Sequence, residues 1–234
     1  DDQKAGLGQG NGWSPPNWAG ISSKMIEVHE ALSKCGMTVL HPNGESLTYQ
    51  TLDAYVDDAN NGANNAHLPN GMDPVDLAYD LQMSSQQWER LLHTTGGALE
   101  LNKCFWSLLS WKWNEAIPTP STIYDTPCTI ELEQSESRET VTIKRLESNE
   151  PFKLLGVQVQ LHGPMNANYK KIEEKARQLA RRIKSSSLSA RAADLAYNSV
   201  AMPQLQYTLL MTTYTDKDIE NIQRPLTKAF LSRI

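Results

Sequence analysis

Apolar residues recur at alternating spacings of three and four in two segments of the chain, which is the pattern of an amphipathic helix. The first segment contains Trp18, Ile21, Met25, Val28 and Leu32. It follows Ser14 and Pro15, a pair typical of a helix start, and it ends before Gly36. The second contains Leu77, Leu81, Trp88, Leu91 and Leu92, between an Asp-Pro pair and a Gly-Gly pair. The sequence therefore predicts helices over about 15–35 and 74–95.

Shorter apolar runs bounded by turn residues predict strands between and after these helices. MTVLH and LTYQTLDAYV flank the turn-prone HPNGES, and the polar ANNGANNAHLPNG that follows predicts an irregular loop. LELNKCFWSLLSWKW is a further strand candidate. PCTIELEQ, ETVTIKRLE and FKLLGVQVQL then predict three strands of a compact antiparallel element.

Beyond Gly163 the pattern becomes helical again. A narrow apolar stripe contains Ile172, Ala176, Leu179, Ala180 and Ile183. Two more helices are predicted over about 189–201 and 216–233, the latter kinked at Pro225. Because the charge balance also changes near residue 165, we expect a domain boundary there.

Composition favours a globular protein, with 39% hydrophobic and 21% charged residues and a formal net charge of -5. No apolar stretch approaches the roughly 20 residues that cross a bilayer, so no membrane partner is expected. The balance reverses from Lys170 to Arg191, where eight basic residues face two acidic ones. Since binding responds to local fields, this is a candidate nucleic-acid patch, and a solvated helix face is the alternative. The missing initiator Met suggests a piece of a longer protein.

The cysteines and histidines show no metal-ligand spacing. Cys35, Cys104 and Cys128 are expected to be reduced thiols of an intracellular protein, in the cytoplasm or nucleus. His29 is expected on the solvent side of its helix. The tryptophans at 106, 111 and 113 are interpreted as strand packing in the core.

Tyr55, Val56, Asp57 and Asp58 spell YVDD at the end of the strand-like LTYQTLDAYV. Two adjacent carboxylates at a hairpin tip can present oxygen ligands to a pair of divalent cations, as phosphoryl transfer requires. A solvated turn is the ordinary alternative. A calcium-binding EF-hand loop is excluded, because counting from Asp57 places Ala59 at the third ligand position and Leu68 at the twelfth.

Four segments, GLGQGNGWSPPNW, AYVDDA, GGALELNKC and KLLGV, occur in the order and rough spacing of motifs B, C, D and E of reverse-transcriptase palm domains. The chain thus resembles a reverse transcriptase of a eukaryotic retroelement over nearly its whole length. Telomerases and viral RNA-dependent RNA polymerases share the general layout, so the assignment rests on YVDD and GQGNGWSP. The resemblance implies an α+β fold, with a polymerase palm of helices over a small antiparallel sheet in 1–164 and a helical thumb in 165–234.

The resemblance also implies roles for individual residues. Asp57 and Asp58 match the pair that binds two Mg²⁺ ions, with Mn²⁺ as an alternative, and Lys103 matches a lysine proposed to protonate the leaving pyrophosphate. The residues that match contacts to template, primer or nucleotide are Gln9, Gly10, Tyr55, Val56, Leu155, Gly156, Lys171, Lys175 and Arg182. Their ordinary alternatives are a flexible chain end, a core strand and solvated surface positions.

The implied function is RNA-directed DNA polymerisation, with an RNA or DNA template, a primer and deoxynucleoside triphosphates as partners. The chain begins immediately before motif B, so the further metal-binding Asp and the fingers residues of the family have no counterpart in it. We therefore expect the 234 residues alone not to extend a primer. The competing hypothesis is a non-catalytic nucleic-acid-binding relic, and a metal-dependent nuclease would need further clustered acids or a histidine.

Overall fold

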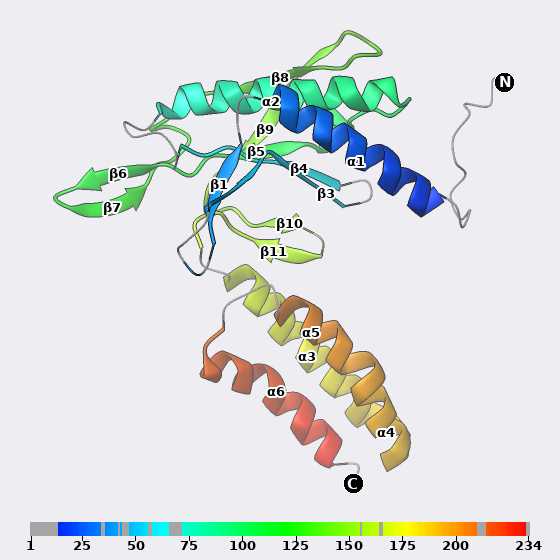
Figure 1. Cartoon of the computed structure of the whole chain (residues 1–234). Coiled ribbons are helices and arrows are strands. Elements are labelled where there is room, and N and C mark those ends of the chain that lie inside the picture. Colours follow the sequence, from blue (N-terminus) through cyan, green and yellow to red (C-terminus); the bar gives the residue numbers. More distant parts are fainter. Residues whose placement is uncertain are drawn as a thin grey trace. The chain divides into compact units, whose positions relative to one another are not determined.

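The computed structural model describes residues 14–33, 36–41, 43, 47–55, 58–65, 72–154, 156–163, 166–209 and 214–232. Small antiparallel strand pairs combine with helices, as the expected α+β class requires (Figure 1). The chain forms two compact units, residues 1–147 and residues 148–234, which we call unit 1 and unit 2. This division precedes the boundary expected near residue 165, so the KLLGV segment belongs to the same unit as the helices that follow it.

Both predicted helices of unit 1 are present, as α1 (Ser14–Leu32) and α2 (Pro74–Thr94). Asp73 caps α2 by accepting a hydrogen bond of 2.8 Å from the amide of Val75. The buried face of α1 differs from the predicted stripe: Met25 is buried, whereas Ile21, Val28 and Leu32 are exposed. Their stripe lies beside the face that packs against Leu52 and Trp88.

Two hairpins follow α1 in the chain (Figure 1). In the first, β1 (Met37–Leu40) pairs with β2 (Leu47–Gln50). In the second, β3 (Leu52–Tyr55) pairs with β4 (Asp58–Asn61). The prediction of an irregular loop after the Asp pair is therefore wrong for the first residues of that segment. The polar strand is supported from α2, because the Asn61 amide donates hydrogen bonds of 2.9 and 3.2 Å to Ser84 and Ser85.

A three-stranded sheet has the order β5 (Phe105–Ser107), β9 (Thr140–Leu146), β8 (Ile130–Glu133). The antiparallel pairing of β8 with β9 agrees with the prediction, whereas β5 joins β9 in parallel. Polar side chains of α2 bind the amides of β8 and the residues after it: Gln82 to Glu131, Gln86 to Glu133 and Glu89 to Ser135, at 2.7–2.9 Å. These bonds satisfy amides that no neighbouring strand pairs.

The third hairpin of unit 1 consists of β6 (Trp111–Asn114) and β7 (Ile117–Pro120). The prediction that all three tryptophans lie in the core is wrong for two of them. Trp106 is buried, but Trp111 and Trp113 are 48% and 69% exposed. Their cross-strand partners are Pro120 and Pro118, which have no amide hydrogen. Because proline cannot donate to a further strand, β7 ends the sheet and the hairpin stays at the surface.

Unit 2 begins with a short hairpin of β10 (Phe152–Leu154) and β11 (Val157–Val159). The prediction of one strand over FKLLGVQVQL is wrong, because the chain turns at Gly156, whose φ is +89°. A glycine tolerates this left-handed conformation without steric cost.

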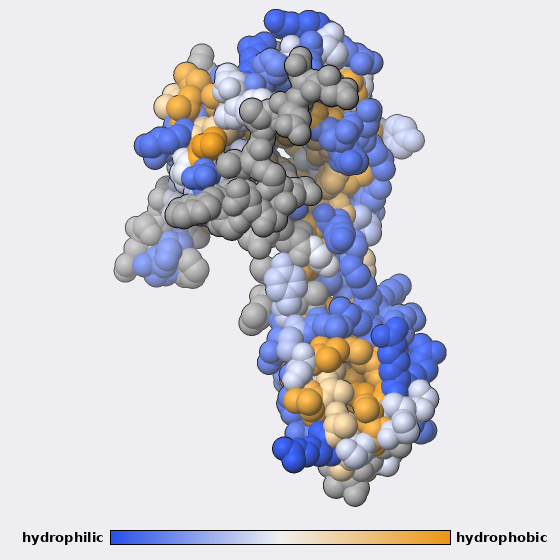
Figure 2. All heavy atoms as spheres, turned by 90° about the vertical axis from the view of Figure 1, so that its right-hand side faces the viewer, coloured by the Kyte–Doolittle hydropathy of each residue, from blue (hydrophilic) through white to orange (hydrophobic). Residues whose placement is uncertain are grey.

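The rest of unit 2 is helical, with α3 (Asn166–Ser185), α4 (Ala190–Ala196) and α6 (Asp216–Leu231). A π-helical turn, Tyr197–Ala201, joins α4 to α5 (Met202–Leu209), so the predicted helix over 189–201 is longer than expected. The core of unit 2 contains apolar residues of α3 and of the helices that follow it: Ile172, Ala176, Ala180, Ile183, Ala193, Ala201, Leu205, Ile222, Leu226 and Ala229. Figure 2 shows an apolar area on one face of this unit. Across the described ranges, no helix is both long and apolar enough to cross a membrane.

Candidate metal-binding hairpin

The described part of the YVDD segment lies at the end of the β3–β4 hairpin. Asp58 opens β4 and pairs with Tyr55, the last residue of β3. Val56 and Asp57 connect the two strands in sequence and lie outside the described residues. The Asp58 side chain is exposed. The predicted hairpin is therefore present, with one of its two carboxylates described.

The Asp58 carboxylate is a suitable ligand for a hard divalent cation. Its oxygens are the ligand type that Mg²⁺ and Mn²⁺ prefer. Among the described residues it has neither a hydrogen bond nor an ion pair that would compete with a cation. Within the same residues, no group of three or more His, Cys, Asp or Glu side chains could hold a metal ion. Asp58, with Asp57 beside it in sequence, is thus the candidate contribution of this chain to a metal site.

A largely buried polar network lies at the opposite end of the same hairpin. We call it the Ser84 network and define it as His29, Ser33, Thr51, Asn61 and Ser84. The His29 ring contacts the Thr51 hydroxyl at 3.3 Å through Nδ1 and the Ser84 carbonyl at 3.1 Å through Nε2. The Ser84 hydroxyl lies 3.0 Å from Ser33 Oγ and 2.9 Å from Asn61 Nδ2. The network joins α1, α2 and both strands of the hairpin.

The prediction that His29 faces solvent is wrong, because its side chain is fully buried. Its ring meets the Trp88 ring edge-on, with centroids 5.7 Å apart. Burial lowers the pKa of His29 below its usual 6.5, although the bond to Ser84 and the nearby Glu30 oppose this. The sequence contains no local signal for this position, since Ser84 lies 55 residues away.

Lys103, the predicted acid for the leaving group, is exposed in a 3₁₀ turn, Leu101–Lys103, just before β5. Its amide donates to Glu100 O at 2.9 Å, which fixes the backbone of the turn. In the described residues no hydrogen bond or ion pair links Lys103 to Asp58. The structure therefore fixes each of the two residues locally without showing a contact between them.

In unit 2, Gly156 and the three basic site residues lie on neighbouring elements. Lys171, Lys175 and Arg182 are exposed on α3, and their spacings of four and seven place them on one side of the helix. The Lys171 ammonium donates to the Gly156 carbonyl at 3.4 Å. Leu155, Gln9 and Gly10 lie outside the described residues. The described basic residues and the β10–β11 turn thus form a second candidate surface.

Comparison with known proteins does not add a relative to these observations. No protein-family model, curated protein or solved structure matches the chain.

Proposed function

We propose that this chain is part of a reverse transcriptase and contributes the palm and the start of the thumb to an RNA-directed DNA polymerase. The palm corresponds to residues 1–164 and the thumb to 165–234. The observation that carries the proposal is the position of Asp58, an exposed carboxylate that opens β4 within YVDD, on a hairpin whose other end is tied to two helices. The partners are an RNA or DNA template, a primer and deoxynucleoside triphosphates.

The chemistry proposed for this site is nucleotidyl transfer to a primer 3′-hydroxyl. Mg²⁺ ions bound to carboxylates supply charge stabilisation and an activated hydroxyl in reactions of this class. Asp57 and Asp58 would hold the ions, and the short paired strands would keep Asp58 from searching among conformations. Lys103 would donate its proton to the departing pyrophosphate. Tyr55 and Val56 would lie under the primer end.

The test is primer extension on an RNA template by the full-length parent protein. We expect Asp57→Asn and Asp58→Asn each to reduce extension by about a hundredfold or more, because each removes a charged metal ligand. Asp53→Asn is the matched control, since Asp53 is an exposed carboxylate on the same hairpin outside YVDD. Equal activity of Asp58→Asn and Asp53→Asn would contradict the proposal.

A second candidate function is nucleic-acid binding without catalysis, and the exposed basic side of α3 favours it. Arg177 forms an ion pair of 2.8 Å with Glu173. Lys171, Lys175 and Arg182 are exposed on the opposite side of the helix. Phosphate contacts of this type are independent of sequence and weaken with salt. For a binder, Asp57→Asn leaves affinity for an RNA–DNA duplex unchanged or slightly higher, and primer extension is absent from the parent protein as well.

The basic side of α3 can be tested directly on the 234-residue chain. In the double variant Lys171→Gln/Lys175→Gln, the slope of log affinity for duplex against log salt should fall by about 2, one for each lost phosphate contact. Fluorescence anisotropy with a labelled duplex measures this slope. Lys217→Gln, in the first turn of α6, is the control and should leave it unchanged. An unchanged slope in the double variant would remove α3 from the binding surface.

A further inference from the structure

The Ser84 network attaches both strands of the Asp58 hairpin at their far ends. Thr51 directly precedes β3, and Asn61 is the last residue of β4. Thr51 meets the His29 ring, and Asn61 meets the Ser84 hydroxyl. Thr51, Ser84 and His29 are each at most 2% exposed, so water does not compete for the hydrogen bonds of the ring. The entry and the exit of the hairpin are therefore held by the same buried group of side chains.

A neutral imidazole satisfies the hydrogen bonds of this site. With a hydrogen on Nε2, His29 donates to the Ser84 carbonyl, and Nδ1 accepts from the Thr51 hydroxyl. The Ser84 hydroxyl also lies 3.1 Å from Nε2, so the other neutral tautomer can accept from Ser84 and donate to Thr51. A second proton would place a charge on a fully buried ring.

The hairpin depends on such attachments, because it is short. Its strands pair four residues each, and an isolated two-stranded hairpin is at best marginally stable in water. Leu52 is buried at the start of β3, but Asp53, Ala54, Asp58, Ala59 and Asn60 are exposed. Packing therefore supports the end of the hairpin near the network, and the strand pairing transmits that support to Asp58.

We propose that Ser84 and His29 are positioning residues for the hairpin that carries Asp58, and that they act through a neutral imidazole. That this hairpin presents Asp58 to a metal ion or substrate rests on the proposed function, whereas the positioning of its strands does not. Protonation of His29 should release the two strands and leave the rest of unit 1 folded. Acid thus loosens the hairpin before it unfolds the unit.

The charged surroundings of the ring oppose its burial only weakly. Glu30, the next residue of α1, is the charged side chain that favours the protonated form. α2 presents the uncharged Ser84 and Trp88 to the ring, and the segment before β3 presents the uncharged Thr51. The Glu89 carboxylate, beside Trp88 in sequence, instead accepts hydrogen bonds from Ser135. No carboxylate among these partners bonds to the ring, so burial dominates.

The experiment is amide hydrogen exchange of the 234-residue chain, followed by NMR and corrected for the intrinsic pH dependence of exchange. At pH 7.5, Ser84→Ala should lower the protection of β3 and β4 amides about tenfold, the effect of one or two lost buried hydrogen bonds. Amides of β8 serve as the internal reference and should change less than about twofold. Thr51→Val should act like Ser84→Ala, whereas Thr51→Ser, which keeps the hydroxyl, should retain protection.

The pH profile separates positioning from a general packing role. In the wild type, β4 protection should fall as the pH decreases from 7.5 to 5.5, while β8 protection falls less. His29→Gln, which can donate to the Ser84 carbonyl but does not titrate, should abolish this dependence. His93→Gln, an exposed histidine of α2, is the matched control and should retain it.

The proposal is overturned if Ser84→Ala leaves β4 protection unchanged, if β8 loses as much protection as β4, or if the pH dependence persists in His29→Gln. None of these readouts requires polymerase activity. A chain that fails primer extension can still pass this test, and an active polymerase can fail it. The two proposals are therefore contradicted by different results.

Discussion

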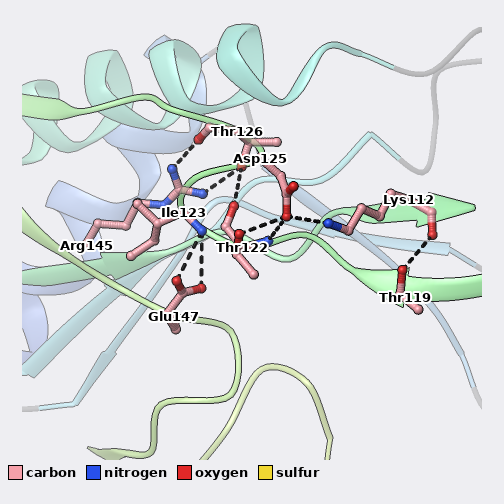
Figure 3. A network of polar contacts seen from close by, with 8 residues as sticks. All are labelled: Lys112, Thr119, Thr122, Ile123, Asp125, Thr126, Arg145 and Glu147. Carbon is pink, nitrogen blue, oxygen red and sulfur yellow. Dashed lines mark hydrogen bonds and ion pairs between the residues drawn. The ribbon is translucent and has the colours of Figure 1, made fainter.

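The β3–β4 and β6–β7 hairpins of unit 1 have the same length but differ in how they are attached. Each pairs four residues per strand. The first is tied to α1 and α2 through buried polar groups and the buried Leu52. The second is held near its base by an ion pair of 2.7 Å between Lys112 and Asp125, both partly solvent-exposed (Figure 3). The number of paired residues is equal in the two hairpins, so the contrast between them lies in the side chains that attach each one to the rest of unit 1.

The largest expected effect separates the two hairpins through a pair of matched tryptophan substitutions. Trp88 is 4% exposed and packs with Met25 and Leu52, whereas Trp113 is 69% exposed on β6. Trp88→Ala should lower the unfolding free energy of unit 1 by about 3–5 kcal/mol, because it leaves a cavity under β3. Trp113→Ala should change it by no more than about 0.5 kcal/mol.

Urea titration followed by circular dichroism measures both variants, with the unit 2 helices as an internal reference. Similar losses in the two variants would mean that β6–β7 is packed as firmly as β3–β4. That result would end the contrast between the hairpins.

The sequence predicted the elements whose determinants are local. Helices α1, α2 and α3 follow from periodicity and end signals, and the β1–β2 hairpin follows from two apolar runs with a polar turn. It did not predict β4, because its polar residues are stabilised by Ser84 and Ser85, 23 or 24 residues away. The parallel pairing of β5 with β9 is likewise non-local.

The carboxylates of the candidate site were proposed from the sequence, but the buried side chains that hold its hairpin were not. Asp58 was identified from residue type and its expected place at a turn. The role of His29 depends on partners from two other segments, Thr51 before β3 and Ser84 and Trp88 of α2, which its neighbours in the sequence did not indicate. Trp111 and Trp113 were assigned to the core from their aromatic character, and the blocking effect of Pro118 and Pro120 on β7 was the signal that could have corrected this.

Acidification should act on the two hairpins in different pH ranges. The pKa of His29 is below 6.5 in the folded protein, so the unfolded chain binds the proton more readily and unit 1 loses stability as the pH falls below 6.5. The pKa of Asp125 is lowered from 3.8 to about 2, chiefly by its hydrogen bond from Lys112. Its contribution is present above pH 3.8 and is lost as the pH falls toward 2.

Urea titrations at pH 7.5 and 5.5 test this order. We expect a lower unfolding free energy of unit 1 at pH 5.5 in the wild type, and a smaller difference in His29→Gln. Asp125→Asn should retain the wild-type difference, because that carboxylate stays ionised throughout the range. If the pH dependence vanished in Asp125→Asn, the acid response would come from the β6–β7 hairpin and not from His29.

The smallest effect concerns the turn of β6–β7, where Glu115 and Ala116 have φ angles of 48° and 70°. Two left-handed residues between the paired Asn114 and Ile117 form the two-residue turn that asparagine and glycine fit best. Each L-residue with a larger side chain costs about 1 kcal/mol in this conformation. Glu115→Asn/Ala116→Gly should therefore stabilise the hairpin by about 1 kcal/mol, seen as higher amide protection in β6 and β7.

Ala31→Gly in α1 is the control with the opposite sign, because glycine weakens a helix by about 0.5–1 kcal/mol. If the double substitution lowered β6–β7 protection, the turn would owe its shape to contacts of Glu115 or Ala116 and not to the backbone. The surface hairpin would then be braced by side chains like its buried counterpart.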